Sequence, residues 1–287
     1  MKIVLFVNRD LAANIAYNLL KSELLEHEVR IYYSDTVGNP KDKPFQLVKL
    51  EYFEREFVFN ELSEFVEENK IVHTFEFLDD RFKSFPLEAC ANVNSSDFVK
   101  EIRSFSPDLF ISIRFGKIFK EEIIRIPKYG LLNLHSAILP FYRGIMGTLH
   151  AIKEGNRNIG CTLHTIPDAG IDTGEIIEIA ELDVNREKSL FWNIVQLYPR
   201  GVALIVRALK GMDSKGLFIS QKQNAHEGNY FSVPTEDDFT QIERLGMKVI
   251  SATDYLNVLT TFVLKGLSES ERERLKICIE RTRLIDN

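Results

Sequence analysis

The sequence predicts an α/β fold, a Rossmann-like and mostly parallel sheet with helices on both faces, plus a smaller C-terminal α/β extension. Short apolar segments of strand type alternate with segments of helical period along the first 135 residues. The apolar segments are nearly continuous hydrophobic runs, as expected for parallel strands that are covered on both faces. The chain has 287 residues, of which 45% are hydrophobic, so it can bury a full core.

The chain opens with a β-α-β unit. Residues 2–8 form an apolar run typical of a buried strand, residues 11–25 have a helical pattern, and residues 28–33 form a second strand pattern. The alternation then continues. We expect a helix over residues 57–68, a strand over 71–77 and a helix over 97–105.

Two further strands carry the chain to its most polar motif. Pro107 ends the preceding helical pattern, and an apolar strand is expected over residues 109–113. A second strand is expected over residues 131–135, directly after Gly130. The first strand is followed by NRDLAAN, which lacks the G-x-G-x-x-G fingerprint of dinucleotide-binding folds. The sheet therefore gives no reason to expect NAD.

The C-terminal third has a different periodicity. A helical pattern spans about residues 188–209 and contains Pro199, which we expect to kink or divide it. Residues 216–232 suggest a short hairpin with a turn near residues 226–229, and residues 251–282 suggest one or two helices. We expect a main domain over residues 1–212 and an extension over 213–287 that packs on it.

Composition narrows the functional classes. The formal net charge of −6 argues against a general polyphosphate-binding surface, so nucleic acid is not expected as a partner. No segment has the length of a membrane helix and the first residues do not form a signal peptide, so we expect a cytoplasmic protein without membrane contact. The three cysteines and six histidines show no metal-ligand spacing, and no metal is expected. The oligomeric state is left open, with a homodimer among the options.

Asn133 and His135 form the most informative pattern in the chain. They are two residues apart at the end of an apolar strand, so their side chains point to the same face. Ligands of open α/β sheets bind at the carboxyl ends of strands. An amide donor, an imidazole that titrates near neutrality and a later carboxylate such as Asp172 form an arrangement that can activate a nucleophile. These three residues are the candidate catalytic groups.

Four segments, PDLFISIRFGKIF, IPKYGLLNLHSAILPFYRG, GCTLHTIPDAGIDTGEII and SQKQN, resemble the folate-dependent formyltransferases in order and spacing. The resemblance covers about residues 100–224. It implies that residues 1–212 form a formyltransferase catalytic domain, that N10-formyltetrahydrofolate is the co-substrate, and that Asn133, His135 and Asp172 correspond to the catalytic residues of the family. A formyl group would then pass to an amine by direct attack through a tetrahedral intermediate.

The same resemblance implies where the substrates bind. The segment Phe115, Gly116, Lys117 and Ile118 resembles one wall of the pterin pocket, and Asp168, Gly170 and Ile171 resemble the second wall. Arg143 is a candidate contact for an anionic part of a substrate, and a salt bridge within the domain is its alternative. Tyr230 is a candidate for stacking on a base or covering a sugar, with core packing as its alternative. His150 and His164 are expected to be packed or solvated.

The amine acceptor has several candidates. The acidic chain and the aromatic, turn-rich segment GNYFSVPTEDDF favour a nucleotide-linked amino sugar, such as a dTDP-4-amino-4,6-dideoxyhexose. Methionyl-tRNA is the first alternative, although the C-terminal part has no concentrated basic face and no run of short strands. Another small amine such as N-hydroxyornithine is a further alternative. A folate-binding protein without activity is the remaining one, which the intact motif disfavours.

Overall fold

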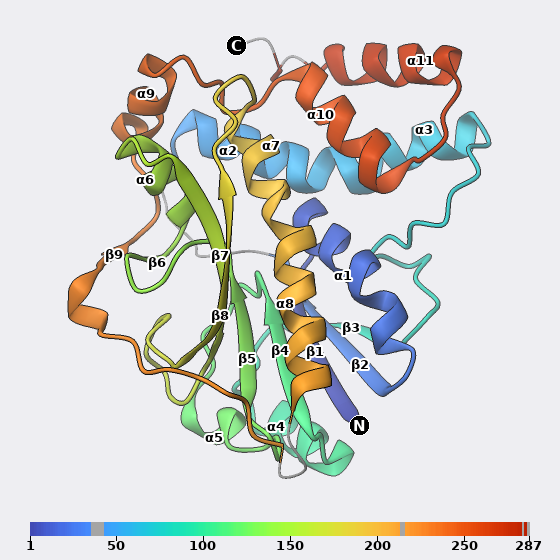
Figure 1. Ribbon diagram of the computed structural model, residues 1–287. Helices are drawn as coiled ribbons and strands as arrows, with labels where there is room; N and C mark the ends of the chain where they lie inside the picture. Colours follow the sequence, from blue (N-terminus) through green and yellow to red (C-terminus); the bar gives the residue numbers. More distant parts are fainter. Residues whose placement is uncertain (36–42, 213–215, 283, 286–287) are drawn as a thin grey trace.

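The computed structural model describes residues 1–35, 43–212, 216–282 and 284–285. A seven-stranded sheet forms its centre, with strand order β3-β2-β1-β4-β5-β7-β8 (Figure 1). Five strands are parallel: β1 (Lys2–Asn8), β2 (Glu28–Ser34), β3 (Leu87–Ala89), β4 (Leu109–Ile113) and β5 (Leu131–His135). Strands β7 (Asn158–Thr165) and β8 (Ile176–Asp183) continue the sheet in antiparallel pairing. The predicted mostly parallel α/β sheet is confirmed.

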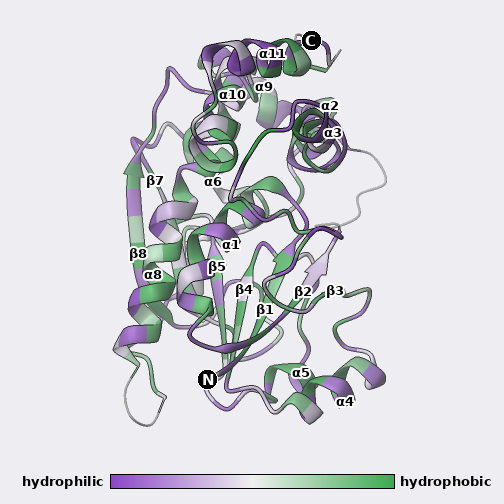
Figure 2. Cartoon of the chain, turned by 90° about the vertical axis from the view of Figure 1, so that its right-hand side faces the viewer, coloured by the Kyte–Doolittle hydropathy of each residue, from purple (hydrophilic) through white to green (hydrophobic). Residues whose placement is uncertain are grey.

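Helices cover both faces of this sheet, as predicted. In Figure 2 the central strands lie between α1 (Leu11–Leu24) and α8 (Leu197–Gly211) on one side and α4 (Ser96–Phe105) and α5 (Glu121–Ile124) on the other. Alternate residues of β1 belong to two hydrophobic clusters. Leu5 lies in the cluster on the α1 and α8 side, and Phe6 lies in the cluster with α4 and α5. Because both faces are buried, the central strands β1 and β4 are almost entirely apolar.

The turn after β1 caps a helix. Asp10 is the N-cap of α1, and its Oδ1 accepts a hydrogen bond of 2.8 Å from the backbone N–H of Ala13. Its second oxygen, Oδ2, accepts from the side-chain amide of Asn8 at 2.7 Å. The segment that replaces a dinucleotide fingerprint therefore forms a tight, side-chain-bonded turn.

The second helical region is longer than predicted. A continuous helix is formed by α2 (Phe45–Glu51), the π-helical segment η1 (Tyr52–Glu61) and α3 (Leu62–Glu68), whereas the sequence pattern predicted a helix only from residue 57. Charged residues interrupt the apolar pattern in residues 51–55, which hides the start of the helix in the sequence. Phe53, Phe57 and Val58 are buried and attach η1 to the core.

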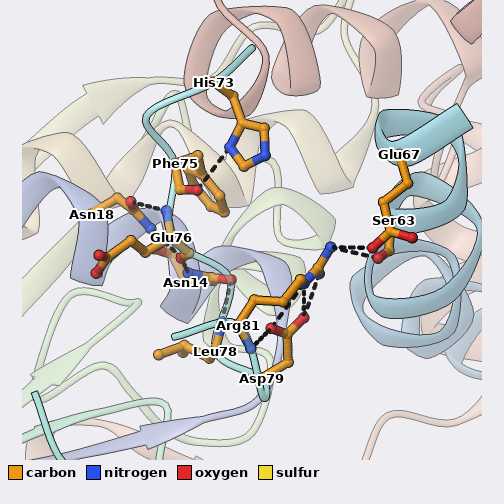
Figure 3. A network of polar contacts seen from close by, with 10 residues as sticks. All are labelled: Asn14, Asn18, Ser63, Glu67, His73, Phe75, Glu76, Leu78, Asp79 and Arg81. Carbon is orange, nitrogen blue, oxygen red and sulfur yellow. Dashed lines mark hydrogen bonds and ion pairs between the residues drawn. The ribbon is translucent and has the colours of Figure 1, made fainter. Parts of the chain in front are cut away.

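The predicted strand over residues 71–77 is wrong: the structure assigns no strand there, and this extended segment lies against α1 instead (Figure 3). The side-chain amide of Asn14 donates to the carbonyl of Glu76 at 2.7 Å, and its oxygen accepts from the N–H of Leu78 at 3.1 Å. Asn18 donates to the same carbonyl at 2.9 Å and accepts from the N–H of Glu76 at 2.8 Å. Two asparagine side chains thus occupy the backbone groups that a neighbouring strand would bond.

The helical pattern predicted over residues 188–209 is divided, as expected. Helix α7 (Leu190–Val195) ends before Gln196, and α8 begins at Leu197. Pro199 is the third residue of α8, where no intrahelical bond to its nitrogen is needed. The division therefore places proline at a position that tolerates it.

The hairpin predicted over residues 216–232 is wrong. After the 3₁₀ turn Ala225–Glu227, strand β9 (Asn229–Phe231) pairs in parallel with β6 (Tyr142–Gly144), which is distant in the sequence. Gly228 allows this approach, because a Cβ there would lie 1.8 Å from the carbonyl oxygen of Pro140. Main-chain pairing at a distance in sequence leaves no local signal, so the turn residues alone suggested a hairpin.

The rest of the C-terminal part is helical. It contains α9 (Glu236–Arg244), α10 (Ala252–Val258), the π-helical Leu259–Val263 and α11 (Glu269–Glu280). Helix α6 (Gly147–Lys153) follows β6 earlier in the chain. Tyr255 donates to the carbonyl of Phe53 at 2.7 Å, and Lys188 donates to Asp254 at 2.9 Å. The predicted boundary between residues 212 and 213 stays a prediction. No helix within the described ranges is long and apolar enough to cross a membrane.

Replacement of Asn14 by alanine tests the bonding of the extended segment. The side chain is fully buried, so Asn14→Ala leaves the N–H of Leu78 without its partner. We expect a loss of about 1–3 kcal/mol in the free energy of unfolding, measured by urea denaturation. The exposed Asn60, whose amide contacts only Glu56, provides the control Asn60→Ala. Equal losses in the two variants would contradict the account.

Candidate functional site

A cavity of about 460 Å³ lies at the carboxyl ends of the parallel strands. Asn8 at the end of β1, Arg114 after β4 and His135 at the end of β5 all line it. The volume is in the usual range for small-molecule sites, about 300–1,000 Å³. The position is the one that open α/β sheets use for ligands.

His135 is buried and has a defined orientation. Its Nε2 lies 2.7 Å from the carbonyl oxygen of Tyr142, and a carbonyl can only accept, so Nε2 carries a hydrogen. The other ring nitrogen, Nδ1, lies 3.6 Å from Oδ2 of Asp172. The tautomer that Tyr142 imposes therefore leaves Nδ1 as the atom that can accept a proton, next to a carboxylate.

Asp172 is the centre of the cluster. Its Oδ2 accepts from the backbone N–H of Gly144 at 2.8 Å, and its Oδ1 lies 3.4 Å from Nε2 of His164. Burial acts to raise the pKa of this carboxyl, but the charge of His135, the contact with His164 and the Gly144 N–H outweigh it and hold the pKa well below its usual range. Asp172 is therefore ionised at neutral pH.

His164 also belongs to this cluster, although its position in the sequence predicted only a packed or solvated side chain. It is fully buried, and its Nδ1 lies 2.8 Å from the carbonyl oxygen of Thr165, so Nδ1 is protonated. In the neutral ring, Nε2 accepts from the side-chain amide of Asn133 at 3.1 Å. When the ring is protonated, Nε2 can donate to Asp172 instead. His164 thus contacts Asn133 in its neutral form and Asp172 in its protonated form, through the same nitrogen.

The signal for His164 lies in the sheet register. Strand β7 pairs with β5 so that Asn133 is directly opposite His164, and the expectation of a packed histidine did not include this neighbour. The antiparallel partner of a strand cannot be read from its own apolar pattern. The contact therefore needed the structure.

The residues that the resemblance assigned to a pterin pocket share one location. They line the cavity as two segments: Phe115, Gly116, Lys117 and Ile118, and Asp168, Gly170 and Ile171. The N–H of Gly116 donates to Oγ of Ser34 at 2.8 Å, which ties this loop to the end of β2. A Cβ on Gly170 would lie 2.5 Å from Oγ1 of Thr173, so a larger residue there would have to displace that side chain.

The two residues predicted to contact a second substrate lie differently. Tyr230 on β9 lines the cavity with its ring about half exposed. Arg143 is not among the lining residues, and its guanidinium donates to the carbonyl of Gly228 at 3.4 Å. The parallel pairing of β6 with β9 thus brings Tyr230 to the site and turns Arg143 toward the backbone.

The structure adds a charged cluster that sequence analysis did not single out. Arg114 donates through Nε to Asp10 at 2.8 Å, through a terminal nitrogen to Glu54 at 2.8 Å, and to the hydroxyl of Tyr198 at 3.2 Å. Burial raises the pKa of Glu54 to about 7, against the charge of Arg114 and with the help of Asp10. The only sequence signal was an arginine directly after a buried strand.

Gln223 holds the backbone of the Asp172 loop. Its side-chain amide donates to the carbonyl of Asp172 at 2.9 Å and to that of Gly174 at 2.6 Å. Asp172 has a left-handed backbone, with φ of 54°, which is unfavourable for a residue with a side chain. The two hydrogen bonds from the C-terminal part therefore stabilise an otherwise costly conformation.

Within the described parts of the chain, no group of three or more His, Cys, Asp and Glu side chains has an arrangement that could hold a metal ion. That no metal takes part stays a prediction. The buried side chains of His135, His164 and Asp172 each have a backbone partner, namely the carbonyls of Tyr142 and Thr165 and the N–H of Gly144.

Known proteins resemble this chain in sequence and in fold. Residues 60–193 match the family model described as formyl transferase. Over this stretch the chain is similar to the formyl transferase family. The matched formyl transferase domain contains Asn133, His135, His164 and Asp172. The resemblance to folate-dependent formyltransferases that the motifs indicated is confirmed at the level of this domain.

Relatives of the formyl transferase domain are found by sequence and by structure. A methionyl-tRNA formyltransferase of Clostridium beijerinckii is 31% identical over 191 residues, 61% of each chain. A likely sugar N-formyltransferase of Mycobacterium tuberculosis has a similar fold, with a TM-score of 0.53 and 19% identity over 84% of this chain and 78% of that one. An N-formyltransferase of Helicobacter canadensis, in complex with folinic acid and dTDP-3-aminofucose, has a TM-score of 0.50 and 18% identity. The match covers 81% of this chain and 71% of that one.

The sequence relatives are longer than the matched region. This chain spans between 43% and 65% of the length of the curated relatives it matches. The structural neighbours are below 25% identity, so they show the fold alone.

The ionised state of Asp172 has a consequence for stability. Its folded-state pKa is depressed, so its contribution is complete above the pKa of an unfolded aspartate, about 3.9, and is lost as the pH falls further. We expect the difference in unfolding free energy between wild type and Asp172→Asn to shrink by about 1 kcal/mol from pH 6 to pH 3. Urea denaturation at several pH values measures it. The variant Asp97→Asn, at an exposed position, should show no such trend.

The role of Gln223 is tested by amide hydrogen exchange. Gln223→Ala removes both side-chain bonds to the loop, so peptides covering residues 170–174 should exchange faster, while those of β5 should not change. Gln221 is two residues away and has an exposed side chain, so Gln221→Ala keeps its main-chain bridge to Ile176 and serves as the control. Unchanged exchange in Gln223→Ala would show that the loop is held by other contacts.

Proposed function

We propose that this protein transfers the formyl group of N10-formyltetrahydrofolate to a primary amine, and that the amine belongs to a nucleotide-linked sugar. The observation that carries the proposal is the cluster of Asn133, His135, His164 and Asp172 beside one cavity in a formyl transferase domain. An amide donor, a proton acceptor and a buried carboxylate are the groups that acyl transfer to nitrogen requires.

The proposed reaction begins with attack of the neutral amine nitrogen on the formyl carbon. As the new C–N bond forms, the carbonyl oxygen gains negative charge and needs hydrogen-bond donors. The amide of Asn133 has two N–H groups, one of which is directed at His164, so the other is available for this oxygen. His164 and the sheet hold that amide in place before the reaction, so little reorganisation is required.

The proton of the attacking amine passes to His135. Nδ1 is the acceptor in the tautomer that the Tyr142 carbonyl imposes, and the carboxylate of Asp172 stabilises the resulting cation. The C–N10 bond of the folate then breaks, and N10 takes the proton that His135 holds. Tetrahydrofolate and the N-formyl product leave, and the protein returns to its initial protonation state.

The two cavity loops are the proposed seat of the pterin. Phe115, Ile118 and Ile171 present apolar surface to the cavity, and the backbone at Gly116 and Gly170 can approach a flat ring with a donor and acceptor edge closely. Asp168 lies at the same wall. Folate in the complex of the structural neighbour is consistent with this choice of co-substrate.

For the acceptor, a nucleotide-linked sugar is favoured over tRNA. The net charge is −6, and the first turn of α9, in the C-terminal part, carries Glu236, Asp237 and Asp238. A polyanion such as tRNA requires a basic surface. Among described residues 216–285 there is one strand of three residues, so they contain no barrel of short strands. The sequence similarity to methionyl-tRNA formyltransferase keeps tRNA as the second candidate.

An acceptor panel tests the proposal. Purified protein with N10-formyltetrahydrofolate is incubated with dTDP- and UDP-linked amino sugars, with charged initiator tRNA, and with N-hydroxyornithine, and release of tetrahydrofolate is followed. We expect release with at least one nucleotide-linked amino sugar and none without an amine. Turnover with tRNA alone would overturn the acceptor, and no turnover with any amine would overturn the function.

The variant His135→Ala controls for adventitious hydrolysis in this assay. It removes both the proton acceptor and its cationic form, so turnover with the accepted amine should fall by about two or more orders of magnitude. Near-normal activity would contradict the mechanism. The exposed His226→Ala, outside the cavity, should retain wild-type turnover.

A further inference from the structure

The cavity has a wall that the proposed chemistry does not use. Leu47, Glu51, Glu54 and Arg55, from α2 and the start of η1, line the same cavity as His135 and Asp172. They are separate from the loops at residues 115–118 and 168–171 that are proposed to hold the pterin. A second substrate has to reach the formyl group through this cavity, so this wall is available to contact it.

The wall is held rigidly by the core beneath it. Phe53 and Phe57 are fully buried next to the charged residues, and the carbonyl of Phe53 accepts from the buried Tyr255 at 2.7 Å. Residues 52–61 are π-helical, a geometry that is rare and often found at functional sites. The side chains of Glu54 and Arg55 therefore project from a backbone that is fixed from behind.

The carboxylates of this wall are already paired. Glu51 accepts from Lys43 at 2.7 and 2.8 Å through its two oxygens. Glu54 is bound to Arg114, which it shares with Asp10. Because burial raises the pKa of Glu54 to about 7, this carboxyl carries only part of a negative charge near neutral pH. Both acids therefore share their charge with another cation, and Arg55 has only the longer contact of 3.8 Å with Glu51.

Arg55 is that cation. Its guanidinium lies 3.8 Å from Oε2 of Glu51, beyond hydrogen-bond distance, and its side chain is 21% exposed. Among the described residues no hydrogen bond to its planar fork is found, in contrast to the fully engaged Arg114. A largely buried guanidinium with unused donors at a cavity wall is suited to a phosphate, which it can bind through two parallel bonds.

We propose that Arg55 binds the diphosphate of the nucleotide-linked acceptor and so sets the specificity for a nucleotide sugar over a free amino sugar. The inference rests on the proposed function for the identity of the acceptor, but the anion site itself rests on the wall described above. The sugar amine would then lie toward His135 and the diphosphate toward η1, with both in one cavity.

Binding of dTDP and of inorganic pyrophosphate, measured by isothermal titration calorimetry without folate, tests the site independently of turnover. Arg55→Gln removes the charge and should weaken dTDP binding by about 10-fold or more, the range of a charge-assisted hydrogen bond. Arg55→Lys keeps the positive charge but loses the planar guanidinium, so its affinity for dTDP should lie between those of wild type and Arg55→Gln. Arg244→Gln removes an exposed arginine outside the cavity and should bind as wild type does.

Steady-state kinetics separate this inference from the proposed function. With an accepted nucleotide sugar, Arg55→Gln should raise KM for the sugar and leave KM for the formyl donor unchanged. Undiminished dTDP binding by both Arg55 variants, or no binding by wild type, would overturn the anion site. Binding that depends on Arg55 without turnover of any nucleotide sugar would uphold the site and overturn the acceptor. Thermal unfolding of each variant confirms that it is folded.

Discussion

The buried carboxylate of Asp172 is the constraint on which the site depends. An ionised group away from water is costly unless hydrogen bonds and opposite charge surround it. Here the partners come from three separate elements: His135 at the end of β5, His164 on β7, and the N–H of Gly144 at the end of β6. Satisfying one charge thus fixes the relative positions of the elements that carry the proposed chemistry.

The sheet supplies the framework that makes this possible. Strand β5 lies between β4, with which it is parallel, and β7, with which it is antiparallel. The first pairing places Asn133 and His135 beside the loop that begins at Arg114, and the second places His164 opposite Asn133. The C-terminal part closes the arrangement, because β9 pairs with β6 and Gln223 bonds the Asp172 loop. Residues far apart in the chain therefore share one structural unit.

The parts of this architecture that sequence predicts are those with local causes. The bounds expected for β1, β4 and β5 match the structure because a continuous apolar run between polar residues is decided by burial alone. Asn133, His135 and Asp172 were found because of their spacing and chemistry, and the structure brings them together. The missing parts have non-local causes. Asn14 and Asn18 replace a strand partner for residues 76–78, and no pattern within that segment records this.

The same reasoning explains why His164 and Arg55 escaped a sequence analysis that located the cavity loops. His164 is a single polar residue in an apolar strand, and only the register with β5 distinguishes it from a packed core histidine. Arg55 lies in a charged stretch that is typical of a solvated helix face, and only the cavity behind η1 makes that face an inner wall. Both are assigned by what they face across the fold.

Two of the left-handed residues on the cavity wall, Arg114 and Asp172, carry opposite charges that are neutralised in different ways. Each has positive φ at a position with a side chain, a conformation that persists only when surrounding contacts enforce it. Arg114 is enforced by Asp10 and Glu54, which also consume its charge. Asp172 is enforced by Gln223 through its backbone, which leaves its charge to the histidines. The charge of Arg114 is therefore neutralised by two carboxylates, whereas the charge of Asp172 faces His135 and His164. A positive charge for an incoming anion must therefore come from another part of the cavity wall. Among the described lining residues outside the loop proposed for the pterin, Arg55 of the π-helical segment is the cation that remains.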